Sequence, residues 1–376
     1  MNPKYQPLME SFCFKNGVEV KNRIVLAPMT ISYSQQDGTI SDELLTYYER
    51  RTYGVGMAIT GSAIVIPNGK VFGGELVADR DDKISSLQRL ATAIKKHGAK
   101  AILQIFHGGR ESFPNVVPNS EIVSASAVVK EESSVIPRAL KEQEIWEIVS
   151  AFGASTRRAI KAGFDGVEIH GANRFLIQQF FSPYTNQRED RWGGNVEKRM
   201  EFPLAVVDEV QKVVAENAKQ PFLVGYRLST EEEWAPRGIT MADTLQLVEA
   251  LAYRNLGYLH VSLMDFWSQP SGGAKNKRSK MEIIYELVGQ RVPVIGVGSI
   301  RTPDEALRAL QTGVPFIALG RELIIDPDWV EKIALGEDTK IRTELSLHDR
   351  ANLGISEPLW LKIINTPGWF PIADKG

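Results

Sequence analysis

Short apolar runs recur along the whole chain, and amphipathic stretches separate most of them. Eight runs are predicted to be β-strands because each is short, rich in branched apolar residues and almost free of polar alternation. They are Arg23–Ala27, Met57–Thr60, Ala101–Ile105, Gly166–Ile169, Phe222–Tyr226, Tyr258–Val261, Pro293–Val297 and Phe316–Leu319. Strands of this kind are typical of parallel sheets that are covered on both faces. The pattern therefore predicts an α/β fold.

Helical periodicity fills several of the gaps between these runs. The predicted helices are Ile84–His97, Lys141–Ala162, Met241–Arg254 and Pro303–Gln311. Glycines at 98, 163 and 313 follow three of them, and glycine readily adopts the left-handed conformation that ends a helix. Thr302 followed by Pro303 is typical of a helix start, with a capping hydroxyl and then proline in the first turn.

Eight strand–helix units in succession predict a single-domain TIM (β/α)8 barrel over residues 1–376. The chain is longer than the roughly 250 residues typical of this fold. The excess is expected in insertions at 111–134 and 182–197 and in a tail after Trp329. A doubly wound open sheet is the alternative, but it usually has a glycine-rich turn after its first strand. The segment from Ala27 to Thr30 has no glycine and cannot form that turn.

Composition narrows the possible partners and location. The net charge is −2 without long blocks of like charge, so neither nucleic acid nor an anionic membrane is an expected partner. Cys13 is the only cysteine, which excludes intrachain disulfides and cysteine-held zinc or iron–sulfur sites. With no apolar signal core or spanning stretch, we expect a cytoplasmic protein acting on a small molecule. The aromatic tail residues Trp360, Trp369 and Phe370 are a candidate contact for homo-oligomer formation.

Reacting groups in a TIM barrel gather at the C-terminal ends of the strands. The residues at the eight strand ends here are mostly amides, hydroxyls and glycines. They lack the lysine of a Schiff-base enzyme and the paired carboxylates of a glycosidase. His107, His170 and Asp265 are too few for the ligand sets of metal-dependent hydrolases.

His170 and Asn173 follow the fourth strand and supply two hydrogen-bond donors at one place. Two converging donors are suited to binding one oxygen atom that gains negative charge during a reaction. Glu168 lies close by, and we interpret it as too early in the strand to react. His170 and Asn173 are therefore the candidate catalytic residues.

The other strand ends favour a phosphorylated, planar cofactor. Glycine-containing turns follow the seventh and eighth strands, where this fold usually binds phosphate, and Arg321 adds a charged fork. Thr30, Gln104 and Arg227 are placed to meet the polar edge of a flat heterocycle. Flavin mononucleotide (FMN) fits both requirements.

Five motifs stand in order between the first strand and the eighth helix. They are NRIVLAPMT at 22–30, QIFHGGR at 104–110, GFDGVEIHGAN at 163–173, the stretch from Ser182-Pro183 to Gly193-Gly194, and ALGR at 318–321. Together they resemble the Old Yellow Enzyme family. The resemblance implies a non-covalent FMN, NADH or NADPH as reductant, and reduction of an activated C=C bond in an α,β-unsaturated carbonyl compound.

The resemblance also implies a role for each residue by position. His170 and Asn173 would bind the carbonyl oxygen of the substrate and stabilise the enolate while hydride reaches the β-carbon. The cofactor-binding residues would be Pro28, Thr30 and Gly61 at the flavin ring, Gln104 and Arg227 at its pyrimidine edge, and Gly298, Ser299, Gly320 and Arg321 at the phosphate.

One position departs from the family pattern. The family commonly has a tyrosine two residues after the asparagine, as the proton donor to the α-carbon, and this chain has Phe175. Tyr33, Tyr184 and Tyr226 are candidate replacements. Two other functions therefore stay open: an FMN barrel dehydrogenase that works in the oxidative direction, and a flavin-binding module without efficient turnover.

Several polar residues have a structural interpretation. His107 either takes part in the site or braces the glycine-rich loop after it. The run from Arg188 to Gly194 is predicted to be a salt-bridged loop outside the site, and Glu231–Glu233 to be solvated surface. Asp265 and Trp267 are candidates for the pocket mouth.

Overall fold

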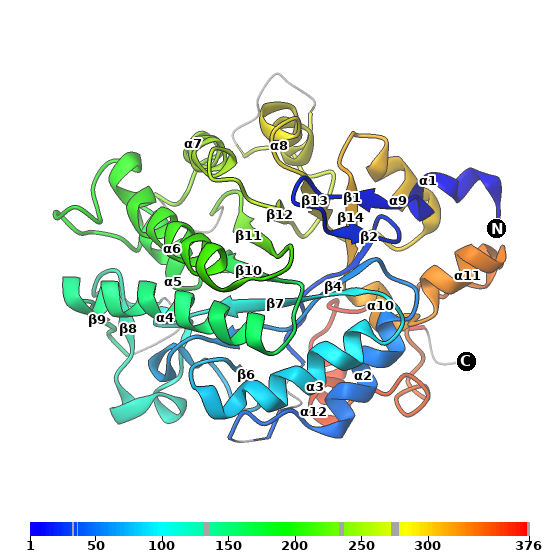
Figure 1. The fold of residues 1–376 in the computed structure, drawn as a ribbon, viewed down its shortest axis with the longest axis horizontal. Helices are drawn as coiled ribbons and strands as arrows, with labels where there is room; N and C mark the ends of the chain where they lie inside the picture. The colour runs from blue at the N-terminus through cyan, green and yellow to red at the C-terminus, as the bar shows by residue number, and fades with distance from the viewer. Residues whose placement is uncertain (32–33, 36, 131–134, 233–236, 272–277, 374–376) are drawn as a thin grey trace.

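Eight parallel strands form a closed barrel in the computed structural model, which describes residues 1–31, 34–35, 37–130, 135–232, 237–271 and 278–373 (Figure 1). The barrel strands are β3 (Ile24–Leu26), β4 (Met57–Ile59), β7 (Lys100–Phe106), β10 (Gly166–Gly171), β11 (Leu223–Ser229), β12 (Tyr258–Ser262), β13 (Val294–Val297) and β14 (Phe316–Leu319). Each pairs in parallel with the next, and β14 pairs with β3 to close the ring. The predicted TIM barrel is confirmed.

The eight predicted runs are the eight barrel strands, with one shift that matters for the site. Strand β10 continues through His170 and Gly171 instead of ending at Ile169. The extension follows from β11, which is seven residues long and pairs Arg227 with His170 and Leu228 with Gly171. His170 is therefore fixed by sheet hydrogen bonds and does not depend on a loop for its position.

Helices cover the outside of the barrel. The large ones are α2 (Asp42–Thr52), α3 (Ile84–Lys95), α4 (Glu142–Lys161), α6 (Val196–Asn217), α7 (Met241–Ala252), α8 (Lys280–Val288) and α9 (Pro303–Leu310). The four predicted helices are α3, α4, α7 and α9, and each ends one or two residues earlier than predicted. Thr302 caps α9 as expected, in a reciprocal hydrogen-bonded pair with Glu305. Gly98 and Gly163 have φ of 84° and 80°, which accounts for glycine after α3 and α4.

Smaller elements close the barrel bottom and build the loops. The hairpin of β1 (Phe12–Cys13) and β2 (Glu19–Val20) carries Phe12 and Phe14, whose rings pack 4.9 and 5.3 Å from that of Phe316. The other strands are β5 (Ala63–Ile64), β6 (Leu76–Val77), β8 (Val123–Ser124) and β9 (Arg138–Ala139). The short helices are α1 (Gln6–Met9), α5 (Leu176–Phe181), α10 (Arg321–Ile325), α11 (Trp329–Leu335) and α12 (Glu357–Ile364).

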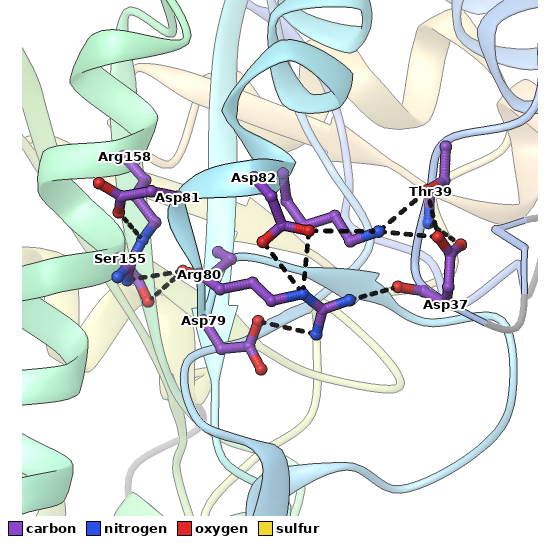
Figure 2. Close-up of polar contacts among 10 residues, drawn as sticks. Asp37, Thr39, Asp79, Arg80, Asp81, Asp82, Ser155 and Arg158 are labelled. Carbon is purple, nitrogen blue, oxygen red and sulfur yellow. Dashed lines mark hydrogen bonds and ion pairs between the residues drawn. The ribbon is translucent and has the colours of Figure 1, made fainter.

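Charged residues connect the loop before α2 with the start of α3 and the C-terminal end of α4. Figure 2 shows Arg80 between Asp79 and Asp82, with its Nη2 donating to the carbonyl oxygen of Asp37 over 2.8 Å. Arg158 of α4 pairs with Asp81 at 2.7 Å. Each of these ion pairs has at least one exposed partner, so each contributes little alone, and together they fix how the loops meet.

The segment after α11 packs on its own barrel. Arg51 of α2 donates to the carbonyl oxygen of Leu353 over 2.7 Å. Phe370 is buried, and the backbone oxygen of Trp369 accepts from Arg321 Nη1 over 2.8 Å. Trp369 thus packs against its own barrel and lines the cavity at the strand ends. Among the described residues, every helix is too short or too polar to cross a membrane.

Two expectations about polar segments have opposite outcomes. The loop from Arg188 is salt-bridged as predicted, with Arg188 and Asp190 2.6 Å apart. The prediction of solvated surface for 231–233 is wrong at both described positions. Glu232 is buried and accepts a hydrogen bond from Gln178, and Glu231 pairs with Lys280 at 2.8 Å. Glu231 is neutralised by Lys280, and Glu232 accepts hydrogen bonds from the neutral groups of Gln178 and Ser182. These partners are distant in the chain, so the local sequence does not reveal them. Glu233 lies outside the described residues.

Candidate active site

A cavity of about 320 Å³ opens at the C-terminal ends of the barrel strands. This volume is at the small end of the range for small-molecule sites. All but one of the residues predicted for catalysis or cofactor binding line it. They are Pro28, Thr30, Gln104, His170, Asn173, Arg227, Gly298, Ser299, Gly320 and Arg321. The strand ends thus bring residues from distant segments of the chain into one cavity.

Gly61 is the exception. It lines a smaller neighbouring cavity with Thr30 and Tyr48, and its backbone N–H donates to Tyr48 Oη over 2.7 Å. A Cβ atom at this position would lie 2.7 Å from the carbonyl oxygen of Met29. Glycine here allows the second strand end to approach the first, so Gly61 supports the cavity wall from behind.

His170 is a neutral donor whose free nitrogen is defined by its hydrogen bonding. The backbone N–H of Ala172 donates to Nδ1 over 3.3 Å, so Nδ1 is an acceptor and the ring proton resides on Nε2. Burial lowers the pKa of His170 well below its usual value, and the charges of Arg227 and His260 lower it further. The imidazole therefore stays uncharged at neutral pH and offers one N–H.

Asn173 is held in an uncommon backbone conformation with its amide oriented. Its φ is 59°, in the left-handed region that asparagine tolerates better than most residues. Its backbone N–H donates to Ser229 Oγ over 3.0 Å, and Oδ1 accepts from Ser262 Oγ over 3.2 Å. With Oδ1 used in this way, the Nδ2 group is the part of the side chain that remains to donate into the cavity.

Gln104 is oriented from below by a buried carboxylate. Its Nε2 donates to Glu168 Oε1 over 2.7 Å, and Glu168 Oε2 is 2.9 Å from His260 Nδ1. Glu168 and His260 are completely buried. Because the amide nitrogen of Gln104 is engaged, its carbonyl oxygen Oε1 is the atom available to a ligand in the cavity. Sequence reasoning gave Glu168 no role in the site and did not consider His260.

Arg227 brings a positive charge into the cavity wall. Burial lowers its pKa and Glu168 raises it again, and a guanidinium stays protonated under these conditions. Its Nη2 donates to Ser262 Oγ over 3.1 Å, while its Nε is buried without a partner among the described residues. A buried N–H of this kind has capacity for an acceptor on a ligand.

The seventh and eighth strand ends form one cradle. Gly298 has φ of 152°, and a Cβ atom there would lie 2.3 Å from the backbone nitrogen of Phe266. Ser299 follows with φ of 50°, donates to the carbonyl oxygen of Met264 and accepts from Arg321 Nη2, both over 2.6 Å. Arg321 is thereby fixed between Ser299 and the tail, with its charge beside the cradle.

A second cavity of about 340 Å³ adjoins the first and shares Asn173 and Phe175 with it. Its walls include Phe72, Phe113 and the ion pair of Lys130 with Glu111, 2.6 Å apart. Residues of the insertion after the third barrel strand therefore form part of the wall of this second cavity. Leu263 and Met264 line the first cavity from the loop after β12.

Tyrosine is absent from the described residues that line either cavity. The ring of Phe175 contacts that of His170 edge to face at 4.9 Å. Tyr226 is buried behind β10, where its Oη lies against Gly171, and Tyr184 lies near Arg110. Tyr33 lies outside the described residues. Neither described tyrosine is therefore in position to protonate a ligand in these cavities.

Other candidates from the sequence have structural roles. His107 is buried, accepts from the backbone N–H of Gly109 and lies 3.1 Å from Asn68, so it braces its loop. Trp267 packs on Arg308 and Phe266 and is not a lining residue of the cavity. Asp265 accepts from the backbone of Trp267.

The cavity also contains residues that the sequence did not single out. Ser262, Glu322 and Lys362 had no predicted role in the site, and Trp369 was predicted only as a candidate contact between subunits. Ser262 directly follows a predicted strand and Glu322 directly follows Arg321, so their sequence positions could have indicated a place in the site. Lys362 and Trp369 come from the tail, and only the three-dimensional path of the chain brings them here.

The profile of the NADH:flavin oxidoreductase / NADH oxidase family matches residues 7–340. The chain belongs to this family. A probable NADH-dependent flavin oxidoreductase of Bacillus subtilis is 51% identical over 374 residues, covering all of both chains. The NADH:fumarate oxidoreductase of Klebsiella pneumoniae is 41% identical over 357 residues, which are 94% of this chain and 38% of that protein. The chain thus corresponds to little more than a third of that larger relative.

Solved structures agree with the family assignment. Morphinone reductase in complex with tetrahydroNAD aligns with a TM-score of 0.74 and 28% identity, over 88% of this chain and 91% of that one. The resemblance to Old Yellow Enzymes drawn from the five motifs is confirmed. The protein is an NAD(P)H-dependent flavin oxidoreductase with FMN as its cofactor.

The donor and acceptor atoms of the cavity fit FMN. The pyrimidine edge of a flavin combines an N–H donor with carbonyl and ring-nitrogen acceptors, and here Gln104 offers Oε1 beside the N–H groups of Arg227. The cradle at Gly298 and Ser299 leaves backbone exposed next to Arg321, which suits a phosphate. This agreement comes from the chemistry of the residues and is independent of the family name.

Proposed function

We propose that this enzyme reduces activated C=C bonds, passing a hydride equivalent from NADH or NADPH through FMN to an α,β-unsaturated carbonyl compound. The observation that carries the proposal is the pair of oriented donors, His170 Nε2–H and Asn173 Nδ2–H, in the cavity that Gln104 and Arg227 also line. Such a pair is suited to an oxygen that becomes an enolate.

The cofactor would be held by three groups of residues. Gln104 Oε1 would accept from the flavin pyrimidine edge and Arg227 would donate to it, while Pro28 and Thr30 would lie against the ring. Gly298, Ser299, Gly320 and Arg321 would bind the phosphate. Gly61 would support the ring only indirectly, since it lies behind the first strand end.

FMN supplies two-electron chemistry, accepting a hydride from the nicotinamide and giving one to the β-carbon of the acceptor. As that C–H bond forms, the π electrons of the C=C bond move toward the carbonyl oxygen, where His170 and Asn173 donate hydrogen bonds. A single donor of this type contributes about 3 kcal/mol in comparable sites. Water would supply the α-proton, because Phe175 has no hydroxyl group and no tyrosine lines the described cavity walls.

The relatives support this substrate class. Among them are proteins named for the reduction of fumarate, acrylate and morphinone, compounds that each carry a C=C bond conjugated to a carbonyl group. The adjoining cavity, with Phe72 and Phe113 in its walls, would admit the nicotinamide and then the acceptor in turn. We also propose a cytoplasmic location, supported by the single exposed cysteine.

Phenol binding and turnover test the proposal together. The purified protein is expected to be yellow, to bleach with NADH or NADPH without oxygen, and to recover its colour with an enone. p-Hydroxybenzaldehyde is expected to shift the flavin spectrum, and His170→Ala and Asn173→Ala each to weaken that binding at least tenfold. Exposed His348 supplies the matched control, His348→Ala. Unchanged phenol affinity in both site variants contradicts the proposal.

The absence of tyrosine from the described cavity walls favours one competing function, a flavin module that is reduced but turns over poorly. Steady-state kinetics separates the two. Rapid reduction by NADH combined with enone turnover no faster than free FMN would identify the module. A dehydrogenase working in the oxidative direction would instead reduce its flavin with a saturated carbonyl compound in the absence of nicotinamide.

A further inference from the structure

A carboxylate is buried directly beneath the proposed flavin edge, and the reaction described above does not use it. Glu168 lies on β10 two residues before His170, so its side chain leaves the same face of the strand, one layer deeper in the barrel. It is completely buried. A charge in such a place is costly unless it is paired and hydrogen-bonded.

Residues of strands β7 and β12 form hydrogen bonds with this carboxylate. Gln104 of β7 donates to Oε1 over 2.7 Å, and the ring of His260 of β12 lies 2.9 Å from Oε2. Burial raises the pKa of Glu168, but His260 and Arg227 lower it more, and the net direction is downward. Glu168 is therefore ionised. Burial lowers the pKa of His260 more than the neighbouring Glu168 carboxylate raises it.

The carboxylate determines which end of the Gln104 amide faces the cavity. An ionised carboxylate accepts hydrogen bonds and cannot donate one, so Gln104 must direct Nε2 down and Oε1 toward the ligand. Without the charge, the amide has two nearly equivalent orientations. Only the observed orientation matches a flavin edge that presents an N–H group to it.

The same charge acts on the reduction potential. Arg227 favours the negative charge that reduction adds to the flavin, whereas Glu168 opposes it from below. In a low-dielectric interior these effects are strong because little water screens them. The opposite charges of Arg227 and Glu168 largely cancel at the barrel centre. The reduced flavin is therefore a stronger hydride donor than it would be beside Arg227 alone.

We propose that Glu168 is a positioning residue for FMN: its carboxylate orients the Gln104 amide, and its charge lowers the reduction potential of the bound cofactor. The proposal rests on the placement of FMN given under Proposed function. It extends that placement to a residue that would not touch the cofactor and would act through Gln104.

Three variants of the FMN-loaded protein test the two parts separately. Glu168→Gln removes the charge with little change of shape, and we expect at least a tenfold shift of the two-electron equilibrium toward reduced flavin, which is about 30 mV in midpoint potential. Glu168→Asp keeps the charge but retracts it from Gln104, so the potential should stay at the wild-type value while FMN dissociates at least tenfold more readily. Glu249→Gln, an exposed carboxylate on α7, is the matched control and should change neither quantity.

A double-mutant cycle distinguishes positioning from a general structural effect. In a Gln104→Met background, Glu168→Asp should alter FMN affinity less than twofold, because the amide that it orients is gone. Equal losses in both backgrounds overturn the positioning role, and an unchanged potential in folded Glu168→Gln overturns the charge role. If Glu168→Gln does not fold, the Glu168→Asp cycle decides the positioning role, and a potential of Glu168→Asp that departs from the wild-type value overturns the charge role. Wild-type apoprotein that takes up no FMN would instead contradict the placement of the cofactor.

Discussion

Ser262 Oγ donates to Asn173 Oδ1 over 3.2 Å, and Ser262 Oγ also accepts from Arg227 Nη2 over 3.1 Å. One hydroxyl thus connects the residue proposed to contact the flavin edge with one proposed to bind the substrate oxygen. The direction of the two hydrogen bonds leaves Asn173 Nδ2 as the donor that faces the cavity. The geometry of the proposed oxyanion site is therefore determined partly by β12, a strand that supplies neither of its two donors.

Ser262→Ala is expected to weaken binding of p-hydroxybenzaldehyde about fivefold, since one neutral hydrogen bond is worth about 1 kcal/mol. The amide of Asn173 would lose its preferred orientation while the backbone stays in place through Ser229. A spectral titration of the flavin measures the affinity. Ser262→Thr retains a hydroxyl group and should keep most of the wild-type affinity for p-hydroxybenzaldehyde. Equal affinities of wild type and Ser262→Ala would contradict the proposed orientation of Asn173.

Phe175→Tyr should place a phenolic hydroxyl group at the edge of a cavity whose described walls contain no tyrosine. Phe175 lines both cavities and contacts His170, so the new hydroxyl would lie near the proposed substrate carbonyl. We expect enone turnover to rise severalfold, below the 100-fold or more of an evolved general acid. Flavin reduction by NADH should be unchanged, because it needs no proton at this place. Stopped-flow measurement of the two half-reactions separates these effects, and a faster reductive half alone would contradict the reasoning.

The pH dependence of stability should carry the signature of buried histidine. Burial lowers the pKa of His107 to about 3. Between its usual value near 6.5 and 3 the unfolded chain binds a proton that the folded chain does not, so the folded state loses stability as pH falls through this range. The slope from this residue approaches about 1.4 kcal/mol per pH unit.

Denaturant unfolding at pH 7.5 and pH 5.5 measures that slope. Between pH 7.5 and pH 5.5, the free energy of unfolding of His107→Gln should fall by about 1 kcal/mol less than that of wild type. Each protein is compared with its own value at pH 7.5. His348→Gln, at an exposed position, should retain the wild-type slope. Parallel slopes for wild type and His107→Gln would contradict the inference.

The barrel and most of the cavity were predictable from the sequence, because parallel strands in a barrel all end on the same side of the ring. Once eight apolar runs are recognised, the residues after them must meet at one end of the ring. Helices α2, α6 and α8 were not predicted. The sequence of α2 is largely polar, and α6 contains Pro203, which usually disfavours a helix interior. Packing of α4 on α6 compensates for that cost.

What the sequence left out depends on contacts between distant strands. Glu168 looked misplaced for chemistry, and only the register of β10 beside β7 brings it to Gln104. The tail approaches the cavity because Arg321 binds the backbone of Trp369, a contact that spans 48 residues. Neither relationship has a local signature, since both arise where the closed ring and its long tail bring separate segments together.

Glu322 should make stability fall as the pH becomes alkaline. It is buried beside Arg321, and both carboxylate oxygens lack hydrogen-bond partners among the described residues. Burial and the charge of Asp326 raise its pKa to about 8. Above its usual pKa near 4.5 the unfolded chain releases a proton that the folded chain keeps, so stability from this group declines as pH rises toward 8.

Glu322→Gln removes this titration with little change in shape. We expect the variant to be more stable than wild type at pH 9 by up to about 3 kcal/mol, and the difference to shrink toward pH 5. Because Glu322 lines the same cavity as Gly320 and Arg321, FMN affinity should also fall less steeply with rising pH in the variant. Denaturant unfolding and fluorescence titration with FMN at pH 5, 7 and 9 measure both effects, with Glu249→Gln as control. A stability difference that is independent of pH would show that the carboxyl of Glu322 is already ionised at pH 5.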